Sequence, residues 1–268
     1  MRERRTEIKV VILLIKEGAD KEAEDPEGHT PLLLAAKHGF LQTVRLLLSE
    51  RASVHATNQE GNTALMLAAM CGNGDTITEL MKWSADANAA NKYRFTSLHL
   101  AAEEGHTFAV KVLLQEKANL NHGNGGADSP LLLALKGCQM EMVKLLIEKG
   151  ADVNAWNEDR MTPLLQIAIL GQTEVVQLLV EKRADMNAKM KGLNALQLAA
   201  RHGQGETAAC LKKELEKLLC SPDMNLWQRR KCARQVNEAI SGAIQIAKTR
   251  GYKHVVKLLK PKEPKDRG

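Results

Sequence analysis

One pattern of apolar and polar residues recurs along most of the chain. Each copy has a short stretch rich in leucine and alanine, then a glycine, then a second stretch with apolar residues at i, i+3 and i+4. This spacing predicts two short helices per copy. The first stretch reads HTPLLLAAKHG from His29, NTALMLAAMCG from Asn62, FTSLHLAAEEG from Phe95, DSPLLLALKGC from Asp128, MTPLLQIAILG from Met161 and LNALQLAARHG from Leu193.

The copies follow a fixed period. Aligned on Thr30, Thr63, Thr96, Ser129, Thr162 and Asn194, the first four intervals are 33 residues and the fifth is 32. A seventh copy begins at Gly242, after an interval of 48 residues. A period in this range predicts a stacked array of helical repeats, because a single repeat cannot bury both faces of its helices.

The residues of one repeat predict its local structure. Thr30 followed by Pro31 is typical of a helix N-cap with proline in the first turn. Gly39 can end this first helix by adopting a positive φ. Val44 and Leu47 then mark a second helix, and an extended segment, here called the finger, leads to the next N-cap.

These motifs resemble the ankyrin repeat family. The resemblance rests on T-P-L-x-x-A-A, the helix-ending glycine, the L-L pair and G-A-D-x-N-A at a 33-residue period, and it covers the chain from about Ile8 to about Leu259. It implies an all-α solenoid of antiparallel helix pairs with β-hairpin-like fingers, elongated and curved. Several residues depart from the pattern: Arg94, Ala127 and Arg160 replace a finger glycine, and 121–126 looks loose. The fourth repeat also has Leu135 in place of alanine and Cys138 in place of the helix-ending glycine, so we expect it to be the irregular one.

We expect four segments along the chain. Residues 1–27 would be an incomplete first repeat with only its second helix and finger, because Leu13 and Leu14 align with a second helix. Residues 28–220 would be ankyrin repeats. Residues 221–260 would hold an inserted basic helix and a C-terminal capping repeat, and residues 261–268 a disordered tail.

The inserted helix concentrates positive charge. Residues 201–268 contain 16 Lys+Arg against 7 Asp+Glu, although the whole chain carries only +6. We expect an N-cap at Ser221, a helix reaching Lys248 with a break near Gly242, and Leu226, Trp227 and Val236 on one side of it. The opposite side would be either a solvated face or a docking site for an acidic partner; its residues are Arg229, Arg230, Lys231 and Arg234.

No catalytic motif appears in the sequence. Nucleophile-elbow, P-loop, H-E-x-x-H and dinucleotide-binding patterns are lacking, so we expect no enzyme, no cofactor and no metal site. His99 stands where the ankyrin family often has a histidine, and we interpret it as structural. Five cysteines without C-x-x-C spacing favour reduced thiols in the cytoplasm, with the nucleus as an alternative. No apolar run is long enough to span a membrane.

The resemblance implies recognition of another protein on the concave face of a solenoid. We therefore expect a monomeric, non-catalytic scaffold, adaptor or inhibitor. One alternative is a regulator that contacts nucleic acid or an acidic partner through the basic helix, although no nucleic-acid module is present. Another is the targeting fragment of a larger signalling protein. The expected partner-binding residues are Tyr93, Phe95, Trp156, Met161, Ile169, Leu170, Met190 and Arg201.

One modification is also implied by the resemblance. Residues 146–154 read L-I-E-K-G-A-D-V-N, which looks like the pattern that the 2-oxoglutarate-dependent asparaginyl hydroxylase recognises in ankyrin repeats. Asn154 is the candidate, and Asn88 and Asn187 are poorer ones. The same asparagine is expected to hold the turn through hydrogen bonds to the backbone.

Overall fold

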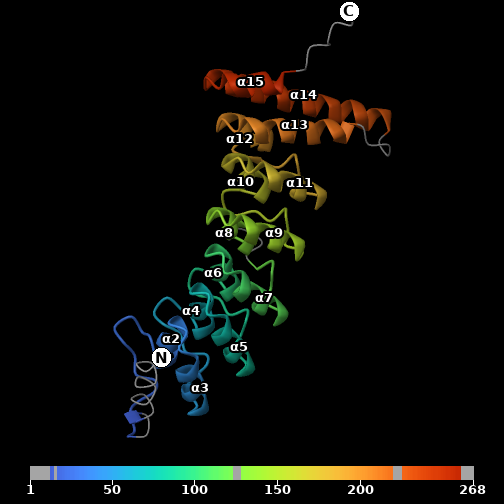
Figure 1. Ribbon diagram of the computed structural model, residues 1–268. Coiled ribbons are helices and arrows are strands. Elements are labelled where there is room, and N and C mark those ends of the chain that lie inside the picture. The colour runs from blue at the N-terminus through green and yellow to red at the C-terminus, as the bar shows by residue number, and fades with distance from the viewer. Residues whose placement is uncertain (1–12, 15–16, 123–127, 220–224, 261–268) are drawn as a thin grey trace, which may run out of the picture. The chain divides into compact units, whose positions relative to one another are not determined.

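The computed structural model describes residues 13–14, 17–122, 128–219 and 225–260 (Figure 1). It divides into two compact units, 1–146 and 147–268. Parts of the expected first repeat, the loose segment 123–127, the expected N-cap at Ser221 and the tail 261–268 lie outside the described residues. Within them, no helix is both long and apolar enough to cross a membrane.

The first unit consists of helix pairs, and the division between the units falls within α9. Its helices are α2 Pro31–Lys37, α3 Leu41–Ser49, α4 Ala64–Met70, α5 Gly74–Lys82, α6 Ser97–Glu103, α7 Thr107–Gln115, α8 Pro130–Lys136 and α9 Met140–Glu148. The second unit holds α10 Pro163–Leu170, α11 Thr173–Glu181, β1 Lys189–Met190, β2 Leu193–Asn194, α12 Ala195–Arg201, α13 Gly205–Leu219, α14 Leu226–Thr249 and α15 Lys253–Leu259.

The residues that the sequence predicts as N-caps and helix-ending residues take these roles in the structure. The Thr30 side chain accepts a hydrogen bond from Leu33 N, and Pro31 stands in the first turn of α2. Thr63, Ser129 and Thr162 cap α4, α8 and α10 in the same way. Beyond α2, Gly39 has a φ of 68° and ends the helix. The backbone geometry that recurs from repeat to repeat follows from the capping oxygen at the start of the helix and the glycine at its end.

Each unit is built from two layers of helices. In the first unit the first helices α2, α4, α6 and α8 pack in series, and α3, α5 and α7 form the second layer. Leu32, Leu65 and Leu98 are fully buried between them. Small residues such as Ala36 and Ala69 have no exposed surface, which allows the first helices to approach closely.

The second unit repeats this arrangement and ends on a longer pair. The helices α10, α12 and α14 form one layer, and α11, α13 and α15 form the other (Figure 1). The C-terminal part of α14 thus stands as the first helix of the seventh repeat, with Ala243 and Ala247 buried. Its N-terminal part is the insertion that the 48-residue interval predicted.

Three details of α14 differ from the sequence-based expectation. The helix runs unbroken through Gly242. A Cβ at this position would lie 2.4 Å from Gln197 Nε2, so the glycine allows the close approach to α12 and does not break the helix. The N-cap is Asn225, which forms a reciprocal capping box with Gln228. Finally, the Lys231 ammonium lies 5.2 Å from the Trp227 ring, so Trp227 shares the basic side.

Successive fingers in the first unit pair through their backbones. Gln59 N donates to Glu27 O at 3.1 Å, and Lys92 N donates to Glu60 O at 3.0 Å. In the second unit, β1 and β2 form an antiparallel hairpin, with Lys189 opposite Asn194. Arg94 and Arg160 keep the positive φ of the glycines that they replace, 66° and 60°. The turn geometry therefore persists despite the side chains.

Candidate functional site

The fingers and first helices of the second unit carry six of the predicted partner-binding residues. Trp156 precedes α10 and is 37% exposed, and the Arg160 guanidinium lies 4.2 Å from its ring centroid. Met161 and Met190 are half-buried finger residues. Ile169 and Leu170 end α10 and are also half-buried, while Arg201 ends α12 and is exposed. Apolar surface thus remains accessible at both the fingers and the helix ends.

In the first unit the two predicted aromatic residues have different surroundings. Tyr93 lies at a finger tip and is 62% exposed. Phe95 is half-buried, and its ring stacks on His99 with 5.6 Å between centroids. Between the first two fingers and the helices α2 and α4 lies a cavity of about 260 Å³, and Met70 contributes to its lining.

His99 lies in the first turn of α6, as part of the capping box with Thr96. It is fully buried, and its Nδ1 lies 3.1 Å from Thr96 N and 2.9 Å from Thr96 Oγ1, so the ring caps the start of α6. Burial lowers the pKa of His99 to about 4, and its electrostatic interaction with nearby His122 acts in the same direction. A neutral imidazole in this position supports the structural interpretation.

Three potential metal ligands gather at the first described finger. One ligand atom from each of Asp25, Glu27 and His29 lies within 4.8 Å of the others. However, His29 Nδ1 is 3.1 Å from Asp25 Oδ2, and its Nε2 is 3.2 Å from Asn58 Nδ2. Asp25 also accepts from the backbone of Glu27 and His29. These groups therefore hold the turn by hydrogen bonds.

The repeated helix pairs and paired fingers agree with the comparisons with known proteins. The family model described as "Ankyrin repeats (3 copies)" matches residues 4–91, 80–157, 98–190 and 155–226. The chain belongs to the ankyrin repeat family. Ankyrin repeats are generally modules of protein–protein interaction, and their fold is typically non-catalytic.

A solved structure agrees with this assignment of the fold. The crystal structure of the human ASB11 ankyrin repeat domain is similar, with a TM-score of 0.69 and 24% sequence identity. The match covers 79% of this ankyrin repeat chain and 94% of that chain. No curated protein matches the sequence. The structural likeness therefore concerns the fold.

Sequence reasoning missed several exposed apolar residues on this ankyrin array. Phe40 and Phe108 stand at the start of second helices, and Trp83 follows α5. Their exposed fractions are 42%, 59% and 43%. The Phe108 ring lies over Gly74, where a Cβ would meet it at 2.0 Å. For Phe40 the available signal was an aromatic next to the helix-ending Gly39.

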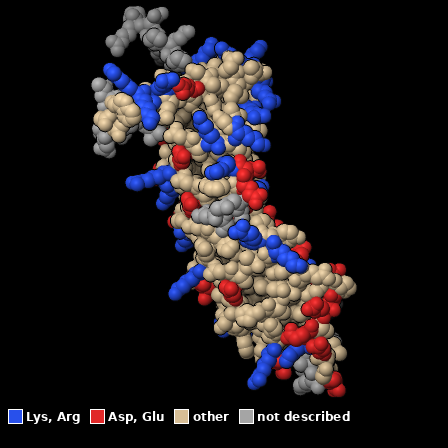
Figure 2. Space-filling model, turned by 180° about the vertical axis from the view of Figure 1, so that it is seen from behind, with Lys and Arg blue, Asp and Glu red and all other residues tan. Residues whose placement is uncertain are grey.

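The predicted basic patch is exposed on α14. Arg229, Arg230, Lys231 and Arg234 are all accessible, although Arg234 pairs with Glu238 at 2.9 Å. Residues 225–260 contain nine Lys+Arg and a single acidic residue, Glu238. Figure 2 shows these basic side chains gathered at the end formed by α14 and α15. The charge is therefore local, as the sequence predicted.

Proposed function

We propose that this ankyrin repeat protein is a non-catalytic scaffold or adaptor that binds a partner protein through its fingers and the ends of its first helices. The observation that carries the proposal is the exposed Trp156, with the Arg160 guanidinium 4.2 Å from its ring. Tryptophan and arginine are the residues most often found at the energetic centre of protein interfaces.

The neighbouring residues extend this surface. Ile169 and Leu170 offer partly exposed aliphatic groups at the end of α10, and Arg201 offers a cation at the end of α12. An apolar centre with a polar rim is the usual anatomy of a binding surface. Tyr93 and Phe95 are the candidates in the first unit. We further propose that the protein acts as a monomer in the cytoplasm, with the nucleus as the alternative.

The proposal is tested by pull-down from cell lysate with three variants. Trp156→Ala and Leu170→Ala remove side chains from the proposed surface, and Trp227→Ala is the matched control because Trp227 is an exposed tryptophan on α14. We expect a specific partner to be lost with the first two variants and retained with the third. Retention of the partner by both Trp156→Ala and Leu170→Ala contradicts the proposal.

A second candidate function rests on the basic surface of α14. Residues 225–260 contain nine Lys+Arg against one acidic residue, which favours an acidic partner, including nucleic acid. A triple charge reversal at Arg230, Lys231 and Arg234 tests it in a mobility-shift assay with a random oligonucleotide. Binding by the wild type that weakens with salt and disappears in the variant supports this function. No shift at low salt excludes nucleic acid.

A further inference from the structure

Among the described residues, no finger follows the β1–β2 hairpin, whereas the fingers that precede α2 and α4 are each covered by the next one. Residues 50–63 join α3 to α4 and contain a turn and a finger, whereas residues 220–225 alone join α13 to α14. In the earlier fingers, Glu27 O and Glu60 O accept hydrogen bonds from the next finger. The equivalent position in the last finger is Lys191, at the tip of the β1–β2 hairpin.

The glycines of the fingers show the same difference between covered fingers and the last described finger. A Cβ at Gly28 would lie 3.0 Å from Gln59 N, and one at Gly61 would lie 3.2 Å from Lys92 N, because the following finger covers both. Gly192 is the equivalent glycine of the last finger. A Cβ there would meet no atom within 4 Å. Within the part of the chain that the structure describes, the side of Gly192 that another finger would cover is therefore open.

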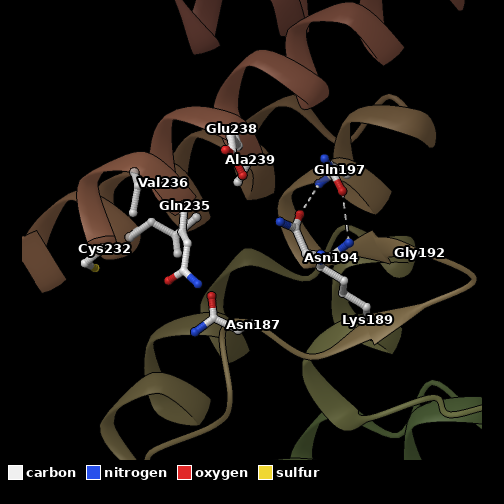
Figure 3. Close-up of a pocket in the computed structure, with 11 residues that line it drawn as sticks. Asn187, Lys189, Gly192, Asn194, Gln197, Cys232, Gln235, Val236, Glu238 and Ala239 are labelled. Atoms are coloured by element: carbon white, nitrogen blue, oxygen red, sulfur yellow. Dashed lines mark hydrogen bonds between the residues drawn. The ribbon is translucent and has the colours of Figure 1, made fainter. Parts of the chain in front are cut away.

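A hollow of about 430 Å³ occupies this side, and we call it the end hollow. The hairpin and the turn before it form one wall through Asn187, Lys189 and Gly192. The N-terminal part of α14 forms the other wall through Cys232, Gln235 and Glu238. Figure 3 shows the side-chain amides of Asn187 and Gln235 pointing into the space between the two walls.

The charges of the end hollow favour an anionic occupant. Glu238 is paired with Arg234 at 2.9 Å, so its charge is compensated. Lys189 is exposed and has no ion-pair partner among the described residues. Asn194 and Gln197, which also line the hollow, bond each other's backbone in a capping box and carry no charge. Lys189 is thus the uncompensated charge.

We propose that the end hollow binds an extended acidic peptide segment of a partner protein, which takes the place of a further finger. Its backbone N–H groups would pair with the last finger, as Gln59 and Lys92 pair with the fingers before them. Addition of a strand to an open hairpin edge supplies affinity through the main chain, and the side-chain contact with Lys189 supplies specificity. Trp156, Ile169 and Leu170 are not among the residues that line this hollow.

Cys232 provides a built-in probe, because it lines the end hollow and is only half-buried. Alkylation by iodoacetamide would be followed by mass spectrometry on the full chain. The ligand is a short, blocked synthetic peptide of alternating glutamate and threonine, whose carboxylates share one face of a strand. We expect it to slow the alkylation of Cys232 several-fold. Cys71 and Cys138, which are exposed and distant in the sequence, should react at unchanged rates.

Variants and control peptides separate the contribution of the Lys189 charge from that of the backbone hydrogen bonds. Lys189→Glu should abolish the protection, and Lys189→Met should weaken it, whereas Lys257→Glu on α15 should leave it unchanged. Circular dichroism verifies that each variant keeps its helices. A peptide of the same sequence with methylated backbone nitrogens keeps the charge but loses the N–H donors, so it should not protect Cys232.

Several outcomes overturn the proposal. They are the absence of protection by the glutamate–threonine peptide, equal protection by a lysine–threonine peptide, full protection in Lys189→Glu, or full protection by the methylated peptide. Protection by a random single-stranded oligonucleotide without protection by the peptide assigns the hollow to nucleic acid instead. Trp156→Ala should not alter the protection, so failure here is distinguishable from failure of the proposed main surface.

Discussion

At the scale of single residues, the repeat imposes the same backbone conformation on different side chains. Arg94, Cys138 and Arg160 occupy positions where other repeats have glycine, and all three keep a positive φ. A left-handed conformation costs an L-residue roughly 1–2 kcal/mol. The surrounding caps and packing therefore hold these residues in place against a local preference.

This strain makes Cys138→Gly a stabilising substitution. Cys138 has a φ of 54°. We expect the free energy of unfolding to rise by about 0.5–1 kcal/mol, because relief of the left-handed strain exceeds the extra freedom that glycine gives the unfolded chain. Urea denaturation measures it. Gly39→Ala is the matched control and should destabilise, since its Cβ would lie 2.6 Å from Asn73 Oδ1. A lower midpoint for Cys138→Gly contradicts this view.

The buried His99 predicts a loss of stability in acid. Its pKa is lowered from 6.5 to about 4 by burial, so the unfolded chain takes up a proton that the folded protein does not. The stabilisation is complete above pH 6.5 and is lost as the pH falls towards 4, by about 1.4 kcal/mol per pH unit. Urea denaturation between pH 7 and pH 4.5 measures it.

His99→Gln is the matched variant for this prediction. Gln197 caps α12 from the equivalent position, with its Oε1 3.1 Å from Asn194 N, so glutamine can keep the cap without titrating. We expect the pH dependence of the variant to be shallower than that of the wild type. Equal slopes for the two proteins would show that other groups cause the acid sensitivity.

Asn154 combines a structural role with the proposed modification. Its Oδ1 accepts from Asp185 N at 2.7 Å, and its Nδ2 donates to Arg183 O at 3.2 Å. Hydroxylation at Cβ leaves the amide available for both bonds. We expect a mass increase of the peptide that contains Asn154 after co-expression with the asparaginyl hydroxylase. An unmodified peptide, beside a hydroxylated control substrate, ends this hypothesis.

At the scale of elements, side chains of one repeat cap the first helix of the preceding repeat. Asn73 Nδ2 donates to Ala36 O at 3.0 Å and to Lys37 O at 2.9 Å. His106 Nε2 lies 3.0 Å from Met70 O, and Gln204 Nε2 donates to Ile169 O at 3.1 Å. Carbonyls at a helix C-terminus lack partners within the helix. These contacts therefore couple each repeat to the one before it.

Removal of one such contact should weaken the array. We expect Asn73→Ala to lower the free energy of unfolding by about 1–2 kcal/mol, because the carbonyls of the buried Ala36 and the half-buried Lys37 lose their donor. Gln42→Ala on the exposed side of α3 is the control and should change it little. Chemical denaturation of both variants is the measurement. A loss for Asn73→Ala no larger than for Gln42→Ala would contradict the coupling.

At the scale of the whole molecule, stability should vary along the array. An ankyrin array gains its stability from each repeat and from the interfaces between neighbours. The fourth repeat has Cys138 in place of the helix-ending glycine and Leu135 in place of alanine. We expect amide hydrogen exchange between residues 121 and 138 to be faster than in the second and fifth repeats. Uniform protection across the three would contradict this prediction.

The sequence alone determined the repeat, its period and most helix boundaries, because the Thr caps, the helix-ending glycines and the leucine spacing act locally. It also located the basic helix, since charge is read directly from composition. Tertiary structure decided what depends on distant partners. Gly242 is an unfavourable residue in a helix, yet α14 continues through it and packs closely on α12, which a side chain at 242 would prevent. Trp227 lies on the basic side of α14. The end hollow exists because α14 lies beside a finger that no other described finger covers. Such features depend on which elements meet, and neighbours along the chain do not specify that.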